Sequence, residues 1–140
     1  MQRFLTVSKA LLAVTTAIVC LAFCYALLHS PVFQKGERYE FYTGTSSEEI
    51  VLAQSPLAKY RLTGVRGESV RYQGDRVQEL IASFRAEVLF QEEAAGVVNY
   101  YCYSPVLGKG VVIDGKRVNL HIATNDTQTA AGTPVIFGGF

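Results

Sequence analysis

The sequence predicts an α+β fold, a curved antiparallel sheet with one main helix on one face, preceded by a transmembrane or signal helix. Three features lead to this prediction. One uncharged segment near the N-terminus is long enough to span a membrane, and one later segment has the apolar spacing of an amphipathic helix. Most of the remaining chain alternates apolar and polar residues in short runs between turn residues, as antiparallel strands do.

The membrane segment is Ala10–Leu28, nineteen consecutive residues without a charge. A helix of this length crosses a hydrocarbon core of about 30 Å. Arg3 and Lys9 precede it with no acidic residue beside them, so the positive-inside rule places the N-terminus in the cytoplasm. We therefore expect residues 1–28 to anchor a single-pass cell-membrane protein. Secretion after signal cleavage is the alternative, because Cys24-Tyr25-Ala26 fits a small-x-small cleavage site.

The rest of the chain predicts one domain outside the membrane. Residues 29–36 contain a proline and a glycine and are expected to be a linker. Residues 37–140 are expected to form an extracytoplasmic α+β domain. The formal net charge of +1 gives no electrostatic signal for binding nucleic acid, so no nucleic-acid partner is expected.

The helix of this domain is predicted at Asp75–Phe84. The apolar residues that recur at the spacing of one helix face are Val77, Leu80, Ile81, Phe84 and, further on, Val88. Asp75 is a favourable N-cap, and Gln78 three positions later completes a capping-box pattern.

Strands are predicted through most of the remaining domain. Their ranges are Arg38–Thr43, Lys59–Val65, Glu68–Tyr72, Glu87–Glu92, Val97–Ser104, Val111–Ile113, Arg117–Thr124 and Val135–Phe140. Arg66-Gly67, Ala94-Ala95-Gly96 and Asp114-Gly115 are expected to be hairpin turns. Ser46–Leu52 fits a short helix or a strand, and we favour the strand.

A candidate binding surface follows from the alternation in Arg117–Thr124. Val118, Leu120 and Ile122 share one face, which we expect to meet the helix. Asn119 and His121 share the other, which we expect to face outward or into a groove. The candidate binding residues are therefore Asn119 and His121, with Tyr101 and Tyr103 from the neighbouring tyrosine-rich strand.

Other chemistry is sparse in the sequence. Cys20 and Cys24 lie in the apolar segment, so Cys102 has no partner for a disulfide within the domain. Cys102 and His121 form the one available thiol and imidazole pair, and they would serve a nucleophilic reaction only if the strand register brought them together. The spacing of histidines and carboxylates predicts no metal site, and no cofactor motif is complete, so no cofactor is expected.

Six segments carry a resemblance to a known family, and they are Phe41-Tyr42, Thr45-Ser46-Ser47, Gly67-Glu68-Ser69, Asn99 to Pro105, Gly115 to Ala123 and Gly132 to Phe140. On these segments, most clearly on those of the C-terminal half, the chain resembles the YwmB family of exported Firmicute proteins. The resemblance implies a sheet like that of the TATA-box-binding protein, with helices on its convex side. It implies neither catalytic residues nor DNA binding, because a fold does not fix a function.

Two functions follow as expectations. The favoured one is a non-enzymatic, membrane-tethered binding domain on the outer side of a bacterial cytoplasmic membrane, with an envelope protein or a glycan as partner. The alternative is a small extracytoplasmic enzyme that uses Cys102, His121 or a tyrosine hydroxyl.

Overall fold

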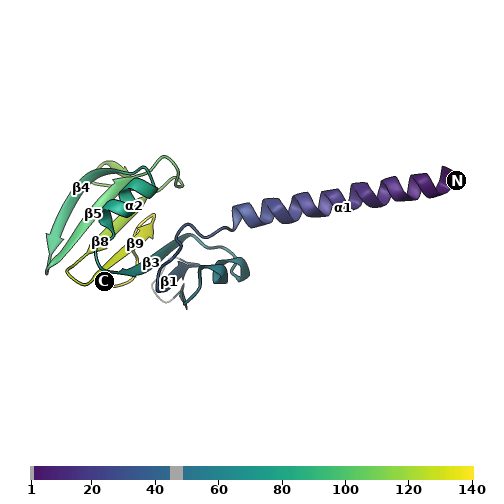
Figure 1. Ribbon diagram of the computed structural model, residues 1–140. Coiled ribbons are helices and arrows are strands. Elements are labelled where there is room, and N and C mark those ends of the chain that lie inside the picture. The colour runs from purple at the N-terminus through teal and green to yellow at the C-terminus, as the bar shows by residue number, and fades with distance from the viewer. Residues whose placement is uncertain (1, 45–48) are drawn as a thin grey trace. The chain divides into compact units, whose positions relative to one another are not determined.

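The computed structural model describes residues 2–44 and 49–140. The chain forms two compact units, Met1–Ser30 and Pro31–Phe140. The first contains one helix, α1 (Gln2–Leu28; Figure 1). Its segment Thr6–Leu28 has 23 residues and a mean hydropathy of 2.5.

Helix α1 is suited to an apolar environment. Its large apolar side chains are exposed along its length. Thr15 and Thr16 each donate their hydroxyl hydrogen to the carbonyl four residues earlier, at 2.9 Å, so these polar groups are satisfied within the helix. The helix therefore fits a membrane anchor or a signal sequence, as the sequence predicts.

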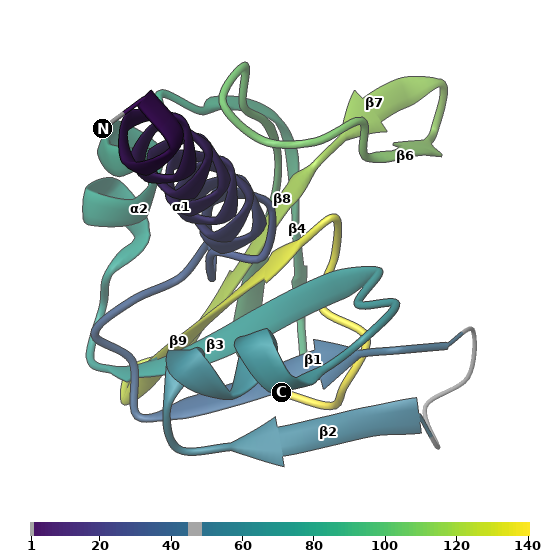
Figure 2. The ribbon, with the colours of Figure 1, turned by 90° about the vertical axis from the view of Figure 1, so that its right-hand side faces the viewer.

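The second unit is an open, seven-stranded antiparallel sheet (Figure 2). In spatial order its strands are β2 (Ile50–Ala53), β1 (Arg38–Tyr42), β3 (Gly67–Gln73), β9 (Gln128–Thr133), β8 (Leu120–Thr124), β5 (Val97–Tyr103) and β4 (Glu87–Ala94). Strands β6 (Val111–Ile113) and β7 (Lys116–Val118) form a separate hairpin. A β-bulge shifts the register of edge strand β4 between Val88 and Phe90. The predicted α+β class is confirmed.

The main core lies between the sheet and helix α2 (Val77–Ser83). Its buried members are Phe33, Tyr39, Phe41, Val70, Val77, Leu80, Cys102, Leu120, Ile122 and Ala131. The predicted packing of Val77 and Leu80 with Leu120 and Ile122 is thus confirmed. Ile81 and Phe84 pack against this cluster, and Val118 is buried outside it.

Helix α2 lies within the predicted range Asp75–Phe84, but its N-cap is Arg76 rather than Asp75, and no side chain caps it there. The Oδ1 atom of Asp75 accepts a hydrogen bond from the backbone N–H of Val77 at 2.9 Å, at the start of the helix. Arg85 has a φ of 48°, outside the helical region, and the chain then enters β4. Val88 therefore lies in a strand, and its expected place on the helix face is wrong.

Two hairpin turns are confirmed. Ala95 and Gly96 have φ angles of 53° and 76°, and Asp114 and Gly115 have 48° and 74°. Positive φ at both central residues characterises the type I′ turn, whose twist matches that of the flanking strands.

The predicted strand Lys59–Val65 is wrong. Pro56–Arg61 forms a 3₁₀ helix, η2, and the Oγ atom of Ser55 accepts a hydrogen bond from the N–H of Leu57 at 3.3 Å. Proline in the first helical position and the serine cap initiate helical turns where the later alternation alone suggests a strand. Arg66-Gly67 is consequently not a hairpin turn, since Gly67 begins β3 and pairs with Tyr42 of β1.

The predicted terminal strand Val135–Phe140 is also wrong, and β9 is a strand that the sequence patterns did not indicate. Strand β9 lies between β3 and β8, where Ala130, Ala131 and Gly132 are buried. Its two faces are both covered, so it shows no apolar and polar alternation.

Two further segments differ in detail from the sequence-based expectations. Arg117–Thr124 is divided at Asn119, where β7 ends and β8 begins. In Ser46–Leu52, residues 46–48 lie outside the described residues, and Ile50 onward forms strand β2.

Part of the expected linker belongs to the folded domain. Phe33 is 1% exposed, and its ring meets Phe84 edge-on at 5.5 Å. The backbone N–H groups of Val32 and Phe33 both donate hydrogen bonds to Oε1 of the buried Glu68. Residues 31–36 are thus packed with the domain.

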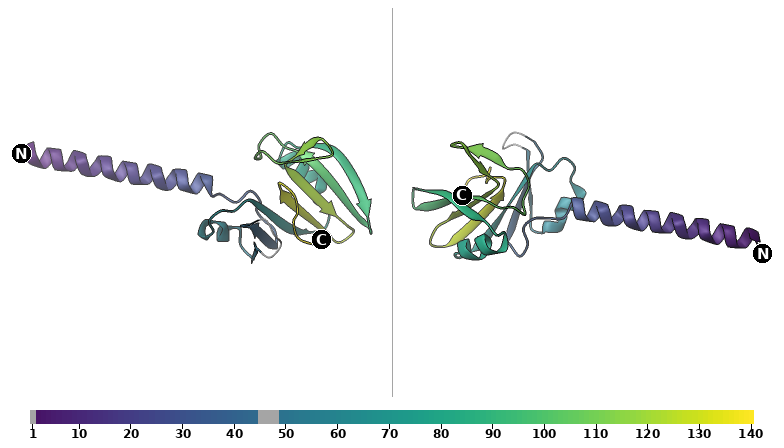
Figure 3. Two further views of the ribbon diagram at one scale, coloured as in Figure 1. Left: turned by 180° about the vertical axis from the view of Figure 1, so that it is seen from behind. Right: turned by 90° about the horizontal axis from the view of Figure 1, so that it is seen from above.

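The central strands of the sheet are covered on both faces, whereas edge strand β4 is largely exposed. Helix α2 lies on one side, and residues 134–140, here called the C-terminal segment, cross the other (Figure 3, right). Gly132 allows this segment to fold back closely, because a Cβ at this position would lie 2.7 Å from backbone atoms of Val135 and Ile136.

Candidate functional site

The pairing of β5 with β8 positions the candidate residues. Tyr101 lies opposite His121, and Cys102 lies opposite Leu120. Paired residues share a face, and successive residues alternate between faces. Tyr101 and His121 therefore lie on the side covered by the C-terminal segment, whereas Cys102 lies on the side of helix α2.

Cys102 is a core residue. Its exposed fraction is 0%, and burial raises the pKa of its thiol to about 11. A thiol in such surroundings stays protonated at neutral pH and is a poor nucleophile. The structure places Cys102 and His121 on opposite faces, so it does not assemble the thiol and imidazole pair of the enzyme alternative.

His121 is buried beneath the C-terminal segment rather than facing outward. Its Nε2 lies 3.0 Å from Oδ1 of Asn99, and its Nδ1 lies 3.3 Å from the backbone nitrogen of Ile136. The N–H of Ile136 can only donate and Oδ1 can only accept, so this network assigns the proton to Nε2. Burial lowers the pKa of His121 to about 4, and the ring is neutral at pH 7.

Asn119 was also expected to face outward, and this expectation is wrong. Its exposed fraction is 1%. Oδ1 accepts a hydrogen bond from the N–H of Ser104 at 2.6 Å, and Nδ2 donates to the carbonyls of Ser104 and Gly108 at 2.7 and 2.9 Å. The side chain thus satisfies backbone groups of the loop that follows β5 and is structural.

Tyr101 and Tyr103 have different surroundings. Tyr101 is partly buried in an aromatic row, with ring centroids 4.6 Å from Phe90 on one side and 4.6 Å from His121 on the other. Tyr103 is 39% exposed. It borders an open pocket of about 450 Å³ that is also lined by Leu89, Lys116 and Arg117. Of the four candidate residues, Tyr103 is the most accessible.

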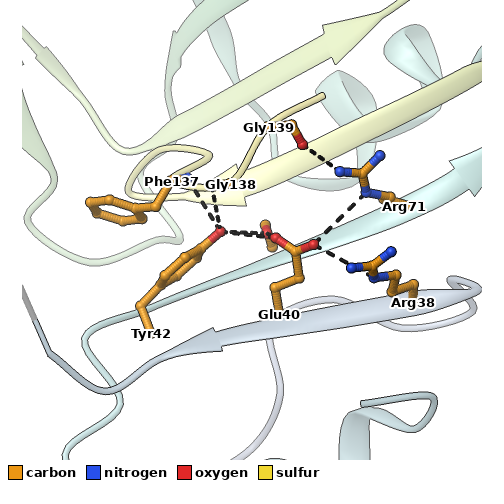
Figure 4. Close-up of polar contacts among 8 residues, drawn as sticks. Arg38, Glu40, Tyr42, Arg71, Phe137, Gly138 and Gly139 are labelled. Carbon is orange, nitrogen blue, oxygen red and sulfur yellow. Dashed lines mark hydrogen bonds and ion pairs between the residues drawn. The ribbon is translucent and has the colours of Figure 1, made fainter. Parts of the chain in front are cut away.

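A polar cluster on the same side of the sheet was not singled out by the sequence. It consists of Glu40, Tyr42, Ser69 and Arg71, with Arg38 at its edge (Figure 4). Oε2 of Glu40 accepts hydrogen bonds from Tyr42 at 3.2 Å and Ser69 at 3.3 Å. Its Oε1 lies 3.7 Å from Nε of Arg38 and 3.9 Å from Nε of Arg71. The buried carboxylate is therefore well compensated.

This cluster holds the C-terminal segment. The Tyr42 hydroxyl oxygen accepts hydrogen bonds from the N–H groups of Phe137 at 3.2 Å and Gly138 at 3.1 Å, and Arg71 donates to the carbonyl of Gly139 (Figure 4). The Phe137 ring packs on Tyr42 with centroids 4.5 Å apart. Burial raises the pKa of Tyr42, so its hydroxyl stays neutral and acts as a hydrogen-bonding hub.

A local signal for the cluster exists in the sequence. In Arg38–Thr43, alternation places Glu40 and Tyr42 on the face opposite to Tyr39 and Phe41. Nothing local indicates that a segment almost a hundred residues later covers them.

A second cavity, of about 440 Å³, lies beside η2 and the loop before β6. Lys59, Arg66 and Lys109 line it, together with the buried Glu68. Oε2 of Glu68 lies 2.9 Å from the Lys59 ammonium, while Oε1 accepts the N–H groups described above. We call this cavity the basic pocket.

Within the described residues, no group of three or more His, Cys, Asp or Glu side chains could hold a metal ion. Comparisons of the chain with protein-family models, curated proteins and solved structures find no match. The resemblance to the YwmB family thus stays a prediction.

Proposed function

We propose that the protein is a membrane-tethered, extracytoplasmic binding domain of the bacterial envelope, without enzymatic activity. The observation that carries this proposal is the direct connection of an apolar 23-residue helix to a compact domain. A retained helix of this kind confines the domain to the membrane surface, where it meets envelope components. Arg3 and Lys9, which lie in α1 on the N-terminal side of its uncharged segment, favour an external domain.

The accessible part of the predicted binding surface supports a contact site around Tyr103. Arg117 and Lys116 border the same pocket as Tyr103. Tyrosine and arginine are enriched in contact surfaces because each combines a large apolar area with hydrogen-bonding groups. The partner is an envelope protein or a glycan.

The topology is tested by adding protease to intact protoplasts. We expect the domain to be digested while residues of the cytoplasmic side stay protected. Protection of the domain until the cells are lysed would contradict the proposal.

The binding surface is tested by replacing Tyr103 with a photo-reactive amino acid in living cells. We expect a discrete cross-linked product from position 103. The matched control is Asp126, which is exposed in the turn before β9. Equal products from both positions, or none from position 103, would exclude this surface.

A further inference from the structure

The basic pocket has the charge of an anion-binding site. Among the described residues, Glu68 is the one acidic residue in its lining, against Lys59, Arg66 and Lys109. The Lys59 ammonium offsets the Glu68 carboxylate at 2.9 Å. Neither Arg66 nor Lys109 forms an ion pair with any residue that the structure describes. The pocket therefore retains two uncompensated positive charges.

The pocket is also held in a defined shape. Glu68 lies in β3, and its carboxylate accepts a hydrogen bond from the backbone N–H of Val32. The same carboxylate forms the ion pair with Lys59 of η2. On the other side, Arg117 donates a hydrogen bond to the carbonyl of Lys109 at 3.2 Å, and Asn119 binds the carbonyl of Gly108. The backbone N–H of Arg66 donates a hydrogen bond to the carbonyl of Tyr42 at 2.7 Å, so Arg66 and Lys109 both project from restrained backbone.

Connectivity keeps the pocket near the membrane. Val32 lines the pocket, and Leu28 is the last residue of the apolar segment. Four residue steps span at most about 14 Å of extended chain, whatever the orientation of the domain. The headgroup region of one leaflet is about 5 to 8 Å deep, so four residue steps are enough for Val32 to reach across it.

We propose that the basic pocket binds the headgroup of an anionic phospholipid in the membrane that α1 spans. Arg66 and Lys109 contact the phosphate oxygens, and the half-buried Val32 and Val65 border the site where acyl chains begin. The proposal rests on the membrane tether, and it does not depend on the contact surface around Tyr103.

The test uses the full chain released from detergent micelles, with bound lipids counted by native mass spectrometry. The probes are phosphatidylglycerol, which is anionic, and phosphatidylcholine, which has no net charge. A basic residue near an anionic headgroup contributes a factor of about five in affinity. We therefore expect the Arg66→Gln, Lys109→Gln double variant to bind phosphatidylglycerol about twenty-five times more weakly than the original chain.

The control variant is Lys35→Gln with Arg85→Gln, which removes the same charge from exposed positions outside this pocket. We expect it to keep its affinity and its preference for phosphatidylglycerol. The charge-preserving variant Arg66→Lys, Lys109→Arg should keep the preference as well, which separates loss of charge from loss of folding.

Three results would overturn the proposal. The first is equal binding of the two lipids, and the second is equal weakening by the pocket and control variants. The third is displacement of phosphatidylglycerol by inorganic phosphate at matching concentration, which would assign the pocket to a free anion. A cross-link at position 103 that persists with any of these results would leave the proposed function intact.

Discussion

The backbone N–H of Ile136 donates a hydrogen bond to Nδ1 of His121 at 3.3 Å, which joins the C-terminal segment to the centre of the sheet. The bond requires an unprotonated Nδ1, since a second proton on the ring would face an N–H donor. The protonation state of His121 is thereby coupled to the position of the C-terminal segment, which covers this face of the sheet.

This coupling predicts a pH dependence of stability. The folded pKa of His121 is about 4 and the ordinary value is 6.5, so between these values the unfolded chain binds a proton that the folded chain does not. The contribution of the neutral His121 ring to folding stability is fully present above pH 6.5 and is lost as the pH falls towards 4. From pH 7 to pH 5 we expect the free energy of unfolding to fall by about 2 kcal/mol from this residue.

The measurement is urea unfolding of the full chain in micelles at both pH values, compared with His121→Gln. Every other residue is common to the two proteins, so the difference between them isolates the imidazole. An unchanged pH dependence in the variant would show that His121 is not the responsible group.

A second prediction concerns Asn119. Asn119→Ala leaves the N–H of Ser104 and the carbonyl of Gly108 without this partner, while the carbonyl of Ser104 keeps the N–H of Leu107 at 3.4 Å. We expect a loss of about 2 to 5 kcal/mol in the free energy of unfolding, because each unsatisfied buried group costs about 1 to 3 kcal/mol. Gln91→Ala, on the exposed side of β4, should change it by less than about 0.5 kcal/mol. Similar values for both variants would contradict the structural role of Asn119.

A third prediction concerns the close return of the chain after β9. Gly132→Ala would place a methyl group 2.7 Å from the backbone of Val135 and Ile136, so the C-terminal segment must move. We expect a loss of about 1 to 3 kcal/mol and a higher pKa for His121, measured by NMR titration. Gly139→Ala is the control, because a Cβ there has nothing within 4 Å. An unchanged pKa of His121 in Gly132→Ala would show that the position of the C-terminal segment does not control the protonation of His121.

A fourth prediction tests the core. Leu80 is 6% exposed and Leu120 is 0% exposed, and they belong to one buried cluster. Leu80→Ala and Leu120→Ala should each lower the free energy of unfolding by about 2 to 5 kcal/mol. Leu52→Ala makes the same chemical change at a residue that is 58% exposed and should have little effect. A cost below about 0.5 kcal/mol for Leu80→Ala would mean that α2 is not held against the sheet in solution.

Elements with strong local signals were predicted well. The apolar spacing after Asp75 located α2, and Asp114-Gly115 located the β6–β7 turn, because neighbouring residues determine these structures. Strand β9 has no such signal. Its small residues fit only because β3 and β8 lie on either side, a long-range arrangement that residues 128–133 do not encode locally.

The candidate site was predicted only in part, because local sequence patterns do not show which residues become buried by distant segments. Alternation identified Asn119 and His121 as polar residues on an apolar strand, but their burial depends on the loop after β5 and on the C-terminal segment. Exposure is a tertiary property, so strand periodicity separates the two faces of a sheet without showing what covers each one.

The two edges of the open sheet bear on how copies of the protein behave beside one another. Confinement to a membrane raises the local concentration of a tethered domain, and exposed sheet edges then favour strand-to-strand polymerisation. The β-bulge in β4 and the carboxylates of Glu87, Glu92 and Glu93 oppose such pairing at one edge. Strand β2, with four residues, offers little length for pairing at the other. Strand pairing between neighbouring copies is therefore opposed at both edges of the sheet.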